Sequence, residues 1–251
     1  MIVLKSPREI ALMRDAARVV VAAQRLCREL SRPGVSTLEI DQEVEGLIRK
    51  AGARPAFKGY RGFPATICAS INEEVVHGIP AAHRRLKEGD IVGLDLGAVV
   101  EGYYADAAFT LAIGEIPPDV QRLLDVTRES LELAIQQARP GNRLGDVSAA
   151  VQRRVEAAGF GVVRAFVGHG IGRELHEDPQ VPNFGEPGKG PLLRAGMVLA
   201  IEPMVTMGHW EVRVLADRWT AVTEDNSLAA HFEHTVAITA DGPDVLTREA
   251  A

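Results

Sequence analysis

The sequence has few cysteines, no run of basic residues and no long apolar segment. Only two cysteines, Cys27 and Cys68, occur among its 251 residues. They are too few for a disulfide framework and lack the paired spacing of a zinc site, so a reducing compartment is expected. The formal net charge of -6, without a cluster of Lys or Arg, leaves no electrostatic footprint for nucleic acid or an anionic membrane. We therefore expect a small-molecule or peptide partner.

The sequence shows neither a targeting segment nor a membrane-spanning one. Residues 1–10 do not combine a basic region with an apolar stretch, as a secretory leader would. The longest apolar run, around residues 19–23, is far too short to cross a bilayer. A cytoplasmic protein is therefore expected. Its 46% hydrophobic and 25% charged residues are ordinary for a globular chain with one substantial core.

Two helices are predicted near the start of the chain. Residues 6–9, Ser-Pro-Arg-Glu, form a capping box with proline at the first helical position, and the amphipathic pattern continues to about residue 30. Residues 36–39 repeat the capping signal. The helix that follows is apolar on one face and ends near Gly52.

The second of these helices and a later strand recur in the sequence at a constant offset of 107 residues. The matching ranges are 33–52 with 140–159 and 91–95 with 198–202. The same offset, without a gap, places Asp95 on Glu202. Chance similarity between amphipathic elements is the alternative, because Gly-Pro punctuation and apolar periodicity are widespread. The superposition of two carboxylates argues against chance.

This period is too long for a solenoid repeat. The order helix, helix, strands in each half predicts two related α+β halves that share one sheet-lined core. We therefore expect one domain over residues 1–251, with halves of approximately 1–112 and 113–251.

An acidic hairpin is predicted within residues 84–111. Its two apolar runs are joined by Val-Val-Glu-Gly, with the turn expected between Val100 and Glu101. That register places Asp95 directly opposite Asp106, with Cβ atoms about 4.5–5.5 Å apart. Ionised carboxylates this close repel each other unless a proton or a cation lies between them. A capping or ion-pairing role is the alternative, but Asp95 lies within an apolar run, where an unpaired charge is costly.

Residues 166–178, FVGHGIGRELHED, form a glycine-framed segment that carries His169 and His176. Its three glycines allow the backbone to approach a ligand closely or to adopt positive φ angles, so a helix is not expected there. Imidazoles in such a segment are candidates for metal ligation or for acid-base chemistry. Neither histidine alone identifies a site.

Two later glutamates also lie where burial is expected. Glu202 follows an apolar strand. Glu233 lies in the alternating segment 231–239 and shares a face with His231. Four carboxylates with one or two imidazoles suit borderline divalent ions such as Mn, Fe, Co or Zn. Because their negative charge exceeds what one ion balances, two ions that share bridging carboxylates are favoured.

Several motifs together resemble the type I methionine aminopeptidases, a family with the pita-bread fold, over essentially the whole chain. These are VVHGIP around His77, GLDLGA and GYYAD with Asp95 and Asp106, GHGIGRELHEDP with His169 and His176, IEP with Glu202, and FEHT with Glu233. The order of motifs and spacers agrees with the family throughout. The resemblance implies two pseudo-symmetric halves in which helices cover a central curved antiparallel sheet.

The resemblance implies a site for two divalent metal ions, which would be Co, Mn, Fe or Zn. One ion would be held by Asp95, Asp106 and Glu233, and the other by Asp106, Glu233, His169 and Glu202. Asp106 and Glu233 would therefore bridge the ions. By the same resemblance Glu202 is expected to carry protons, His176 to donate to the developing oxyanion, and His77 to contact the substrate amide.

The resemblance also implies a narrow apolar pocket for methionine. It would be lined by Tyr60, Phe63, Cys68, Leu175 and Trp219, with His77 and His176 as further substrate contacts. Ordinary core packing is the alternative for the first five. The sequence departs from the commonest family pattern at Ala105 and Ala107, which replace Gly and Thr, and at His231, where Gln is frequent. These changes remove no ligand but affect the groups that orient the carboxylates.

The predicted function is removal of N-terminal methionine from nascent proteins and peptides, preferably before a small second residue. A monomer that contacts the ribosome only transiently is expected. About 25 residues separate His176 from Glu202, which leaves no room for the helical insertion of type II enzymes, and no extension precedes Ser6, so a minimal bacterial form is expected.

Two alternatives remain. A proline-specific aminopeptidase or dipeptidase would share the same five ligands, although such enzymes typically carry a large N-terminal domain. A non-catalytic peptide-binding module of the same fold is the other alternative, and the complete set of ligand side chains disfavours it.

Overall fold

The computed structural model describes residues 1–249, which form helices and antiparallel strands. The helices are α1 (Pro7–Leu30), α2 (Thr37–Lys50), α3 (Pro118–Gln137) and α4 (Leu144–Ala157), with a 3-10 turn, η1, at Tyr60–Gly62. Both predicted capping boxes are confirmed, since Ser6 and Ser36 each exchange hydrogen bonds with the glutamate three residues later. Within this described part, no helix has the length and apolar character needed to cross a membrane.

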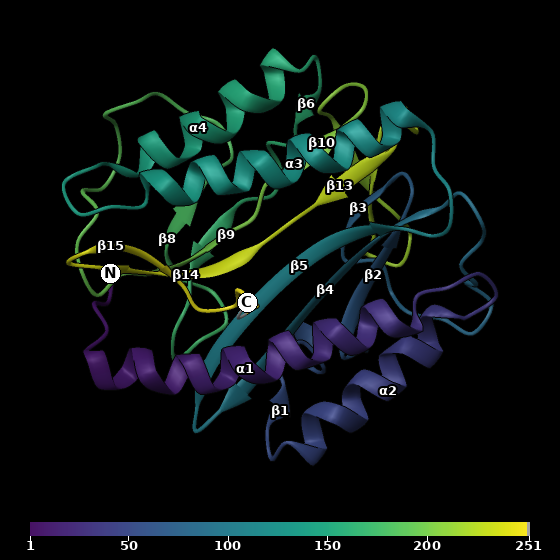
Figure 1. Ribbon diagram of the computed structural model, residues 1–251, viewed down its shortest axis with the longest axis horizontal. Coiled ribbons are helices and arrows are strands. Elements are labelled where there is room, and N and C mark those ends of the chain that lie inside the picture. The colour runs from purple at the N-terminus through teal and green to yellow at the C-terminus, as the bar shows by residue number, and fades with distance from the viewer. Residues whose placement is uncertain (250–251) are drawn as a thin grey trace.

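The first half of the chain is built around a long antiparallel hairpin. β4 (Ile91–Val100) pairs with β5 (Tyr103–Ala112) along its whole length. On its other edge β4 pairs with β2 (Ile67–Ile71) and β1 (Arg54–Pro55). Helix α1 packs on β4 and β5, and α2 packs on β1 and β2. One side of this sheet is thereby covered by helices (Figure 1).

The second half contains a five-stranded antiparallel sheet in the order β15-β14-β9-β7-β8. Its strands are β7 (Gly168–Gly170), β8 (Glu177–Val181), β9 (Val198–Ile201), β14 (His234–Thr239) and β15 (Gly242–Val245). Two small sheets have the orders β13-β10-β6 and β11-β12-β3. Their strands are β3 (Glu74–Val76), β6 (Gly161–Val162), β10 (Met204–Thr206), β11 (Val212–Val214), β12 (Ala221–Thr223) and β13 (Ala229–His231).

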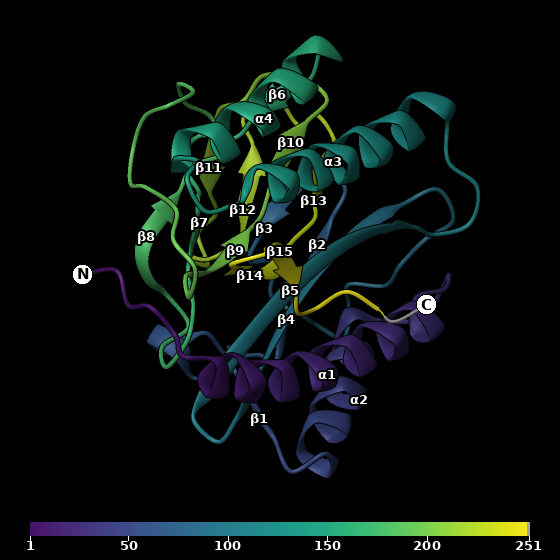
Figure 2. The same cartoon turned by 60° about the vertical axis from the view of Figure 1, so that its left-hand side comes forward.

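The two pairs of helices lie on opposite sides of the strands. In Figure 1, α1 and α2 run along the lower side and α3 and α4 along the upper side, with the strands of both halves between them. Figure 2 shows the same separation after a turn of 60°. Helix α3 packs against α4 and also contacts β13, β10, β9 and β5. This is the α+β layout that the sequence predicted.

The offset of 107 residues recurs in the backbone. Helices α2 and α4 each have 14 residues and begin at Thr37 and Leu144, which are 107 positions apart. Two backbone hydrogen bonds also repeat at this offset. The bond from Gly34 N to Leu86 O corresponds to the bond from Gly141 N to Leu193 O. The bond from Thr37 N to Arg84 O corresponds to the bond from Leu144 N to Pro191 O. Because helix ends and hydrogen bonds both repeat, chance similarity of amphipathic segments does not explain the echo.

The register of the acidic hairpin differs from the prediction. Asp95 pairs with Ala108 and not with Asp106, so the predicted direct pairing of the two carboxylates is wrong. They are diagonal neighbours on the same face, because side chains two positions apart on a strand point the same way. The cause is the turn, in which Glu101 and Gly102 occupy the two central positions with φ angles of 48° and 79°. Type I′ hairpin turns require positive φ at both positions.

Candidate metal centre

The five predicted metal ligands converge from both halves of the fold. Asp95 and Asp106 belong to β4 and β5, the hairpin of the first half. His169 lies on β7, Glu202 directly follows β9, and Glu233 lies between β13 and β14. Strand β9 pairs with both β7 and β14, which brings the last three residues together. The site therefore lies between the two halves.

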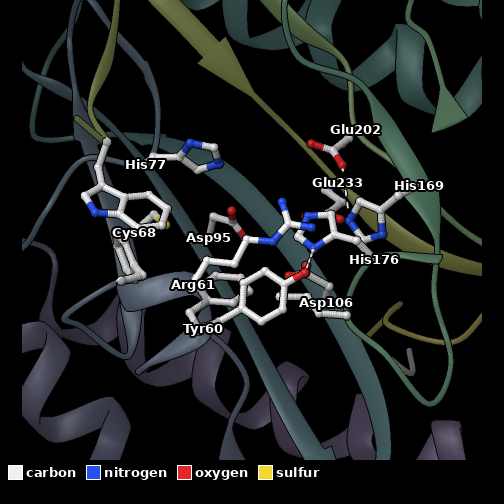
Figure 3. Close-up of a pocket in the computed structure, with 14 residues that line it drawn as sticks. Tyr60, Arg61, Cys68, His77, Asp95, Asp106, His169, His176, Glu202 and Glu233 are labelled. Atoms are coloured by element: carbon white, nitrogen blue, oxygen red, sulfur yellow. Dashed lines mark hydrogen bonds and ion pairs between the residues drawn. The ribbon is translucent and has the colours of Figure 1, made fainter. Parts of the chain in front are cut away.

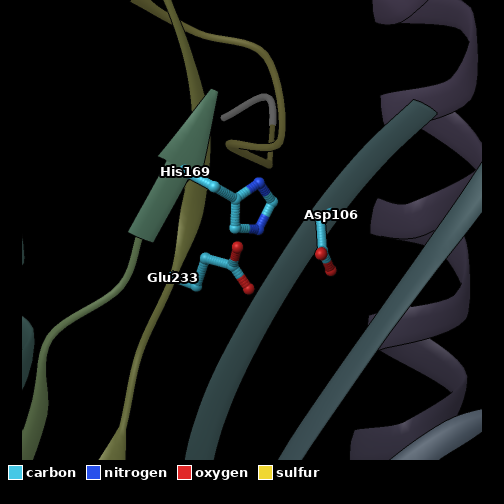
Figure 4. Close-up of side chains that lie close together, drawn as sticks. All are labelled: Asp106, His169 and Glu233. Atoms are coloured by element: carbon cyan, nitrogen blue, oxygen red, sulfur yellow. The ribbon is translucent and has the colours of Figure 1, made fainter. Parts of the chain in front are cut away.

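Three of these side chains lie close enough to share one cation. Ligand atoms of Asp106, His169 and Glu233 all lie within 4.8 Å of one another, and all three residues are buried (Figure 4). Glu202 adjoins them, because its Oε1 lies 3.5 Å from His169 Nε2. His169 Nδ1 lies 2.9 Å from the carbonyl oxygen of Gly170. A proton donated there from Nδ1 leaves Nε2 free as the ligand atom.

Buried polar atoms without hydrogen-bond partners gather at the same place. Among the described residues such atoms occur in Thr66, Asp95, Asp106, His231 and Glu233, and all but Thr66 lie in or beside the cluster. A buried charged oxygen without a partner is costly, so something must satisfy it. Carboxylate oxygens with an imidazole nitrogen suit a divalent transition-metal ion. The residues present therefore fit such an ion.

Burial and mutual repulsion make the carboxyl groups hard to ionise in the metal-free protein. Burial raises the pKa of Asp95 to about 6 and the pKa of Glu202 to about 7. The pKa of Asp106 is raised well above its ordinary value, mainly by burial and next by the charge of Asp95. Burial, and then the charge of Asp106, do the same for the pKa of Glu233. A cation between these groups would remove the conflict.

The backbone of Asp106 is held by a residue from the other half. Thr235 Oγ1 donates to Asp106 O at 2.7 Å and accepts from Asp106 N at 3.0 Å. The neighbours Ala105 and Ala107 are fully buried and carry no hydroxyl for the Asp106 carboxylate. Orientation of this ligand therefore depends on its strand and on Thr235.

His231, the third departure from the family pattern, lies beside the cluster. Its Nε2 is 3.6 Å from Glu202 Oε2, and its side chain is almost fully buried. Burial lowers the pKa of His231, although the charge of Asp95 opposes this. A neutral imidazole here lies beside Glu202 without adding positive charge to the site.

All five predicted ligands and all seven predicted substrate contacts line one cavity of about 660 Å³, measured with its open mouth (Figure 3). The lining consists of Phe57, Tyr60, Arg61, Phe63, Cys68, His77, Asp95, Asp106, His169, Leu175, His176, Glu202, Trp219 and Glu233. Phe63 and Trp219 meet edge to face with ring centroids 5.1 Å apart. The predicted apolar residues thus share a recess that opens onto the carboxylates.

Two further histidines face the cavity from different sides (Figure 3). His176 Nδ1 lies 2.9 Å from the hydroxyl of Tyr60, and its ring centroid lies 4.2 Å from that of His169. If Tyr60 donates to Nδ1, then Nε2 of His176 carries the proton. Desolvation in the cavity, followed by the neighbouring His169, lowers the pKa of His176 to about 3. Burial, followed by His231, lowers the pKa of His77 to about 4, so both rings are neutral at pH 7.

The lining also contains Phe57 and Arg61, which the sequence analysis did not single out. Arg61 follows Tyr60 with a φ angle of 49°, and its guanidinium carbon lies 5.3 Å from the centroid of the Tyr60 ring. Its side chain extends between Asp95 and His176 in Figure 3. An arginine in a Gly-Tyr-Arg-Gly segment is typical of a surface loop, so the sequence did not predict that Arg61 lines the cavity.

The fold and this carboxylate-rich cavity are those of a metallopeptidase. Residues 11–240 match metallopeptidase family M24, and the chain belongs to that family. Its curated relatives include methionine aminopeptidase 1 of Bacillus subtilis (strain 168), 53% identical over 248 residues that cover 99% of this chain and 100% of the relative. Methionine aminopeptidase 1 of Mycobacterium tuberculosis is 49% identical, with 97% of this chain and 94% of the relative covered.

Solved structures agree. The crystal structure of methionine aminopeptidase from Thermotoga maritima has a TM-score of 0.98 and 52% identity, and the match covers 99% of this chain and 100% of that one. The prolidase from Pyrococcus horikoshii has a TM-score of 0.80 and 25% identity, and the match covers 98% of this chain but 64% of that one. The resemblance to methionine aminopeptidases and the pita-bread fold are thereby confirmed.

Proposed function

We propose that this protein is a methionyl aminopeptidase that removes the N-terminal methionine from nascent proteins and peptides, preferably before a small second residue. The observation that carries the proposal is that a recess lined by aromatic and sulfur-bearing side chains opens directly onto buried, unpartnered carboxylates. Near-complete coverage of relatives named methionine aminopeptidase supports the same activity.

The proposed cofactor is a pair of divalent ions, chosen from Mn, Fe, Co and Zn. Asp95, Asp106 and Glu233 would hold one ion, and Asp106, Glu233, His169 and Glu202 the other. Two bound cations supply an activated water at neutral pH and polarise the peptide carbonyl. Four buried or largely buried carboxyl groups with raised or strongly raised pKa values support more than one ion, because a single dication leaves negative charge unbalanced.

The chain itself would supply proton transfer and hydrogen bonds. Glu202, with a pKa of about 7 in the metal-free protein, is suited to take a proton from water and pass it to the leaving amine. His176, neutral and with its Nδ1 next to the Tyr60 hydroxyl, would donate from Nε2 to the oxyanion. His77, on another side of the cavity, would contact the substrate amide.

Methionine would occupy the recess formed by Tyr60, Phe63, Cys68, Leu175 and Trp219. A thioether gains about 0.3–1.5 kcal/mol from each contact with an aromatic ring, which favours methionine over an aliphatic side chain of similar length. The Phe63 and Trp219 rings of this wall support each other through an edge-to-face contact.

The decisive experiment strips the purified protein with a chelator, restores Mn, Fe, Co or Zn singly, and compares cleavage of Met-Ala-Ser with that of an Ala-Pro peptide. Metal-dependent release of methionine from the first peptide alone is expected. Preferential cleavage of the Ala-Pro peptide would instead establish the proline-specific alternative. That alternative is supported by the similarity to the prolidase from Pyrococcus horikoshii, of which the match covers 64%. Absence of cleavage with every metal would favour a peptide-binding module.

Several further features belong to the proposal. They are a single domain with halves near 1–112 and 113–251, a monomeric state, a cytoplasmic location and transient contact with the ribosome. Gel filtration with light scattering tests the monomeric state, and a mass near twice that of the chain would contradict it.

A further inference from the structure

The N-terminal segment before α1 places a buried lysine against the loop that carries His176. Lys5 has only 4% of its side chain exposed, and its backbone N–H donates to Gly196 O at 2.7 Å. Its ammonium group forms an ion pair with Glu177 and donates to the carbonyl oxygen of Val3 at 3.1 Å. A buried ammonium group needs such partners, because desolvation without them is costly.

Glu177 uses both carboxylate oxygens. Its Oε2 accepts from Lys5, while its Oε1 accepts from the backbone N–H of Arg173 at 2.8 Å and of Glu174 at 3.3 Å. On the side of Gly172 the ion pair lies in tight contact with the loop: a Cβ atom at Gly172 would lie 2.4 Å from Lys5 Cε and 2.7 Å from Glu177 Oε1. The ion pair is therefore packed directly against the loop backbone.

That loop, residues 171–176, joins β7 to β8 and carries His176. Its start is fixed by Ile171 N donating to Val198 O at 3.1 Å, and by Gly172 O accepting from Tyr104 N at 2.8 Å. Its later part is fixed by the two amides that Glu177 accepts. His176 also lines a second hollow, together with Lys5 and Glu177, beside the main cavity.

We propose that Lys5 is a positioning residue for catalysis: by neutralising and orienting Glu177, it holds the 171–176 loop so that His176 points at the reacting carbonyl. The inference rests on the proposed role of His176 as donor to the oxyanion. Lys5 itself does not line the main cavity, so it acts through the loop and not on the substrate.

Lys5→Met keeps most of the side-chain volume and removes the charge, which leaves Glu177 as an unneutralised buried carboxylate. It should lower kcat for Met-Ala-Ser by about tenfold or more, because small displacements of a catalytic group are costly, while KM changes by less than about threefold. Lys5→Gln, a milder change that retains a donor, should have a smaller effect. The double variant Lys5→Met/Glu177→Gln should recover part of the lost kcat, because glutamine still accepts from the two amides without a charge.

The discriminating measurement repeats Lys5→Met in a His176→Ala background. If Lys5 acts through His176, its substitution there should change kcat by less than about twofold. Arg154→Met, which breaks the Arg154–Glu129 ion pair between α4 and α3, is the matched control and should leave kcat unchanged. Bound metal should match the parent in every variant.

Equal loss of kcat in both backgrounds would overturn the proposal, since Lys5 would then act on stability or on the metal site. An unchanged kcat in Lys5→Met would also overturn it. If Lys5→Met does not fold, Lys5→Gln carries the same comparison in both backgrounds. If His176→Ala alone leaves kcat unchanged while methionine is still released, the role of His176 fails and this inference fails with it, but the proposed activity stands.

Discussion

Individual carboxylates in the cavity are buried without the partners that buried charges require. Oxygen atoms of Asp95, Asp106 and Glu233 have no hydrogen-bond partner within the described chain. In most buried sites a neighbouring donor satisfies each such oxygen. Here the fold instead places several acceptors around one space, which is the arrangement that a cation needs.

Asp106→Asn should weaken metal binding and lower kcat/KM for Met-Ala-Ser by more than about 100-fold, beyond the 10–100-fold effect typical of changes outside the ligand set. Asp106 is buried and belongs to the group of ligand atoms within 4.8 Å of one another. Metal content after dialysis and calorimetric titration measure the effect. Asp244→Asn, which breaks an ion pair with Arg14 on the surface, is the control. Parental metal content in Asp106→Asn would contradict the site.

The two cysteines should resist alkylation in the folded protein. Burial raises the pKa of Cys27 to about 12 and the pKa of Cys68 well above its ordinary value, and both side chains are almost inaccessible. Only the thiolate reacts, so iodoacetamide at about pH 8 should modify neither residue until urea unfolds the chain. Mass spectrometry with and without urea measures this. Rapid alkylation of Cys68 in the native state would show that its recess opens widely.

The sequence could predict individual site residues only where neighbouring residues in the sequence made them stand out. Asp95 stood out because it interrupts an apolar strand, and Glu202 because it superposes on Asp95 at the offset of 107. Their exact neighbours depended on the turn, where Glu101 and Gly102 both adopt positive φ and shift the register. Lys5 and Arg61 carried no signal, because their positions depend on contacts with distant segments.

Among the elements, the short strand β7 shows how tightly the ligands are placed. It is Gly-His-Gly, and it pairs with β8 on one edge and with β9 on the other. A Cβ atom at Gly168 would lie 2.3 Å from Ala200 O, and one at Gly170 would lie 2.1 Å from Asp178 O. Only glycine on both sides lets neighbouring backbones approach while His169 faces the cavity.

Gly170→Ala should therefore destabilise the protein by about 1–3 kcal/mol or more, because the added methyl group meets backbone atoms that cannot rotate away. Gly46→Ala is the matched control. Gly46 lies within α2, and a Cβ atom there would have no neighbour within 4 Å, so alanine should stabilise the helix by about 0.5–1 kcal/mol. Urea midpoints measure both changes. A midpoint for Gly170→Ala equal to that of the parent would contradict the packing around β7.

The starts of α1 and α2 were predictable for a physical reason, whereas α3 was not predicted. The starts of α1 and α2 depend on Ser6 and Ser36 with a glutamate three residues later, which is information contained in a few adjacent residues. Strand β3 pairs with β12, from the other half of the chain, and such pairing leaves little trace in either segment alone. The large β4–β5 hairpin was predictable because its partners are adjacent.

Across the whole molecule, metal binding should be linked to pH through the carboxyl groups. In the metal-free folded state the pKa of Asp95 is raised from 3.8 to about 6 and that of Glu202 from 4.5 to about 7. These protons stabilise the metal-free fold at low pH, and this stabilisation is lost as the pH rises through the raised values. Metal ions must displace the same protons, so binding competes with them below about pH 7.

The increase in melting temperature caused by a saturating divalent metal should therefore grow as the pH rises from about 5 to about 8. Histidines outside the ligand set that have a lowered pKa, such as His234, titrate in the same way with and without metal. Their contributions to the melting temperature therefore largely cancel when the loaded and chelated proteins are compared. Differential scanning calorimetry of loaded and chelated protein measures it. Calorimetric titration in two buffers should detect more protons released per ion at about pH 6 than at about pH 8. A metal-induced shift that is independent of pH would contradict the linkage.

The crowding of buried acids has a consequence for how this sequence tolerates change. Most positions in a core are selected for folding, but the four carboxylates oppose folding unless a cation or protons arrive. If variants are selected for heat resistance in the presence of a chelator, amides or apolar residues should replace these carboxylates. If variants are selected for aminopeptidase activity that supports cell growth, the carboxylates should be kept. Loss of these acids in a variant would thus indicate selection for stability and no longer for catalytic turnover.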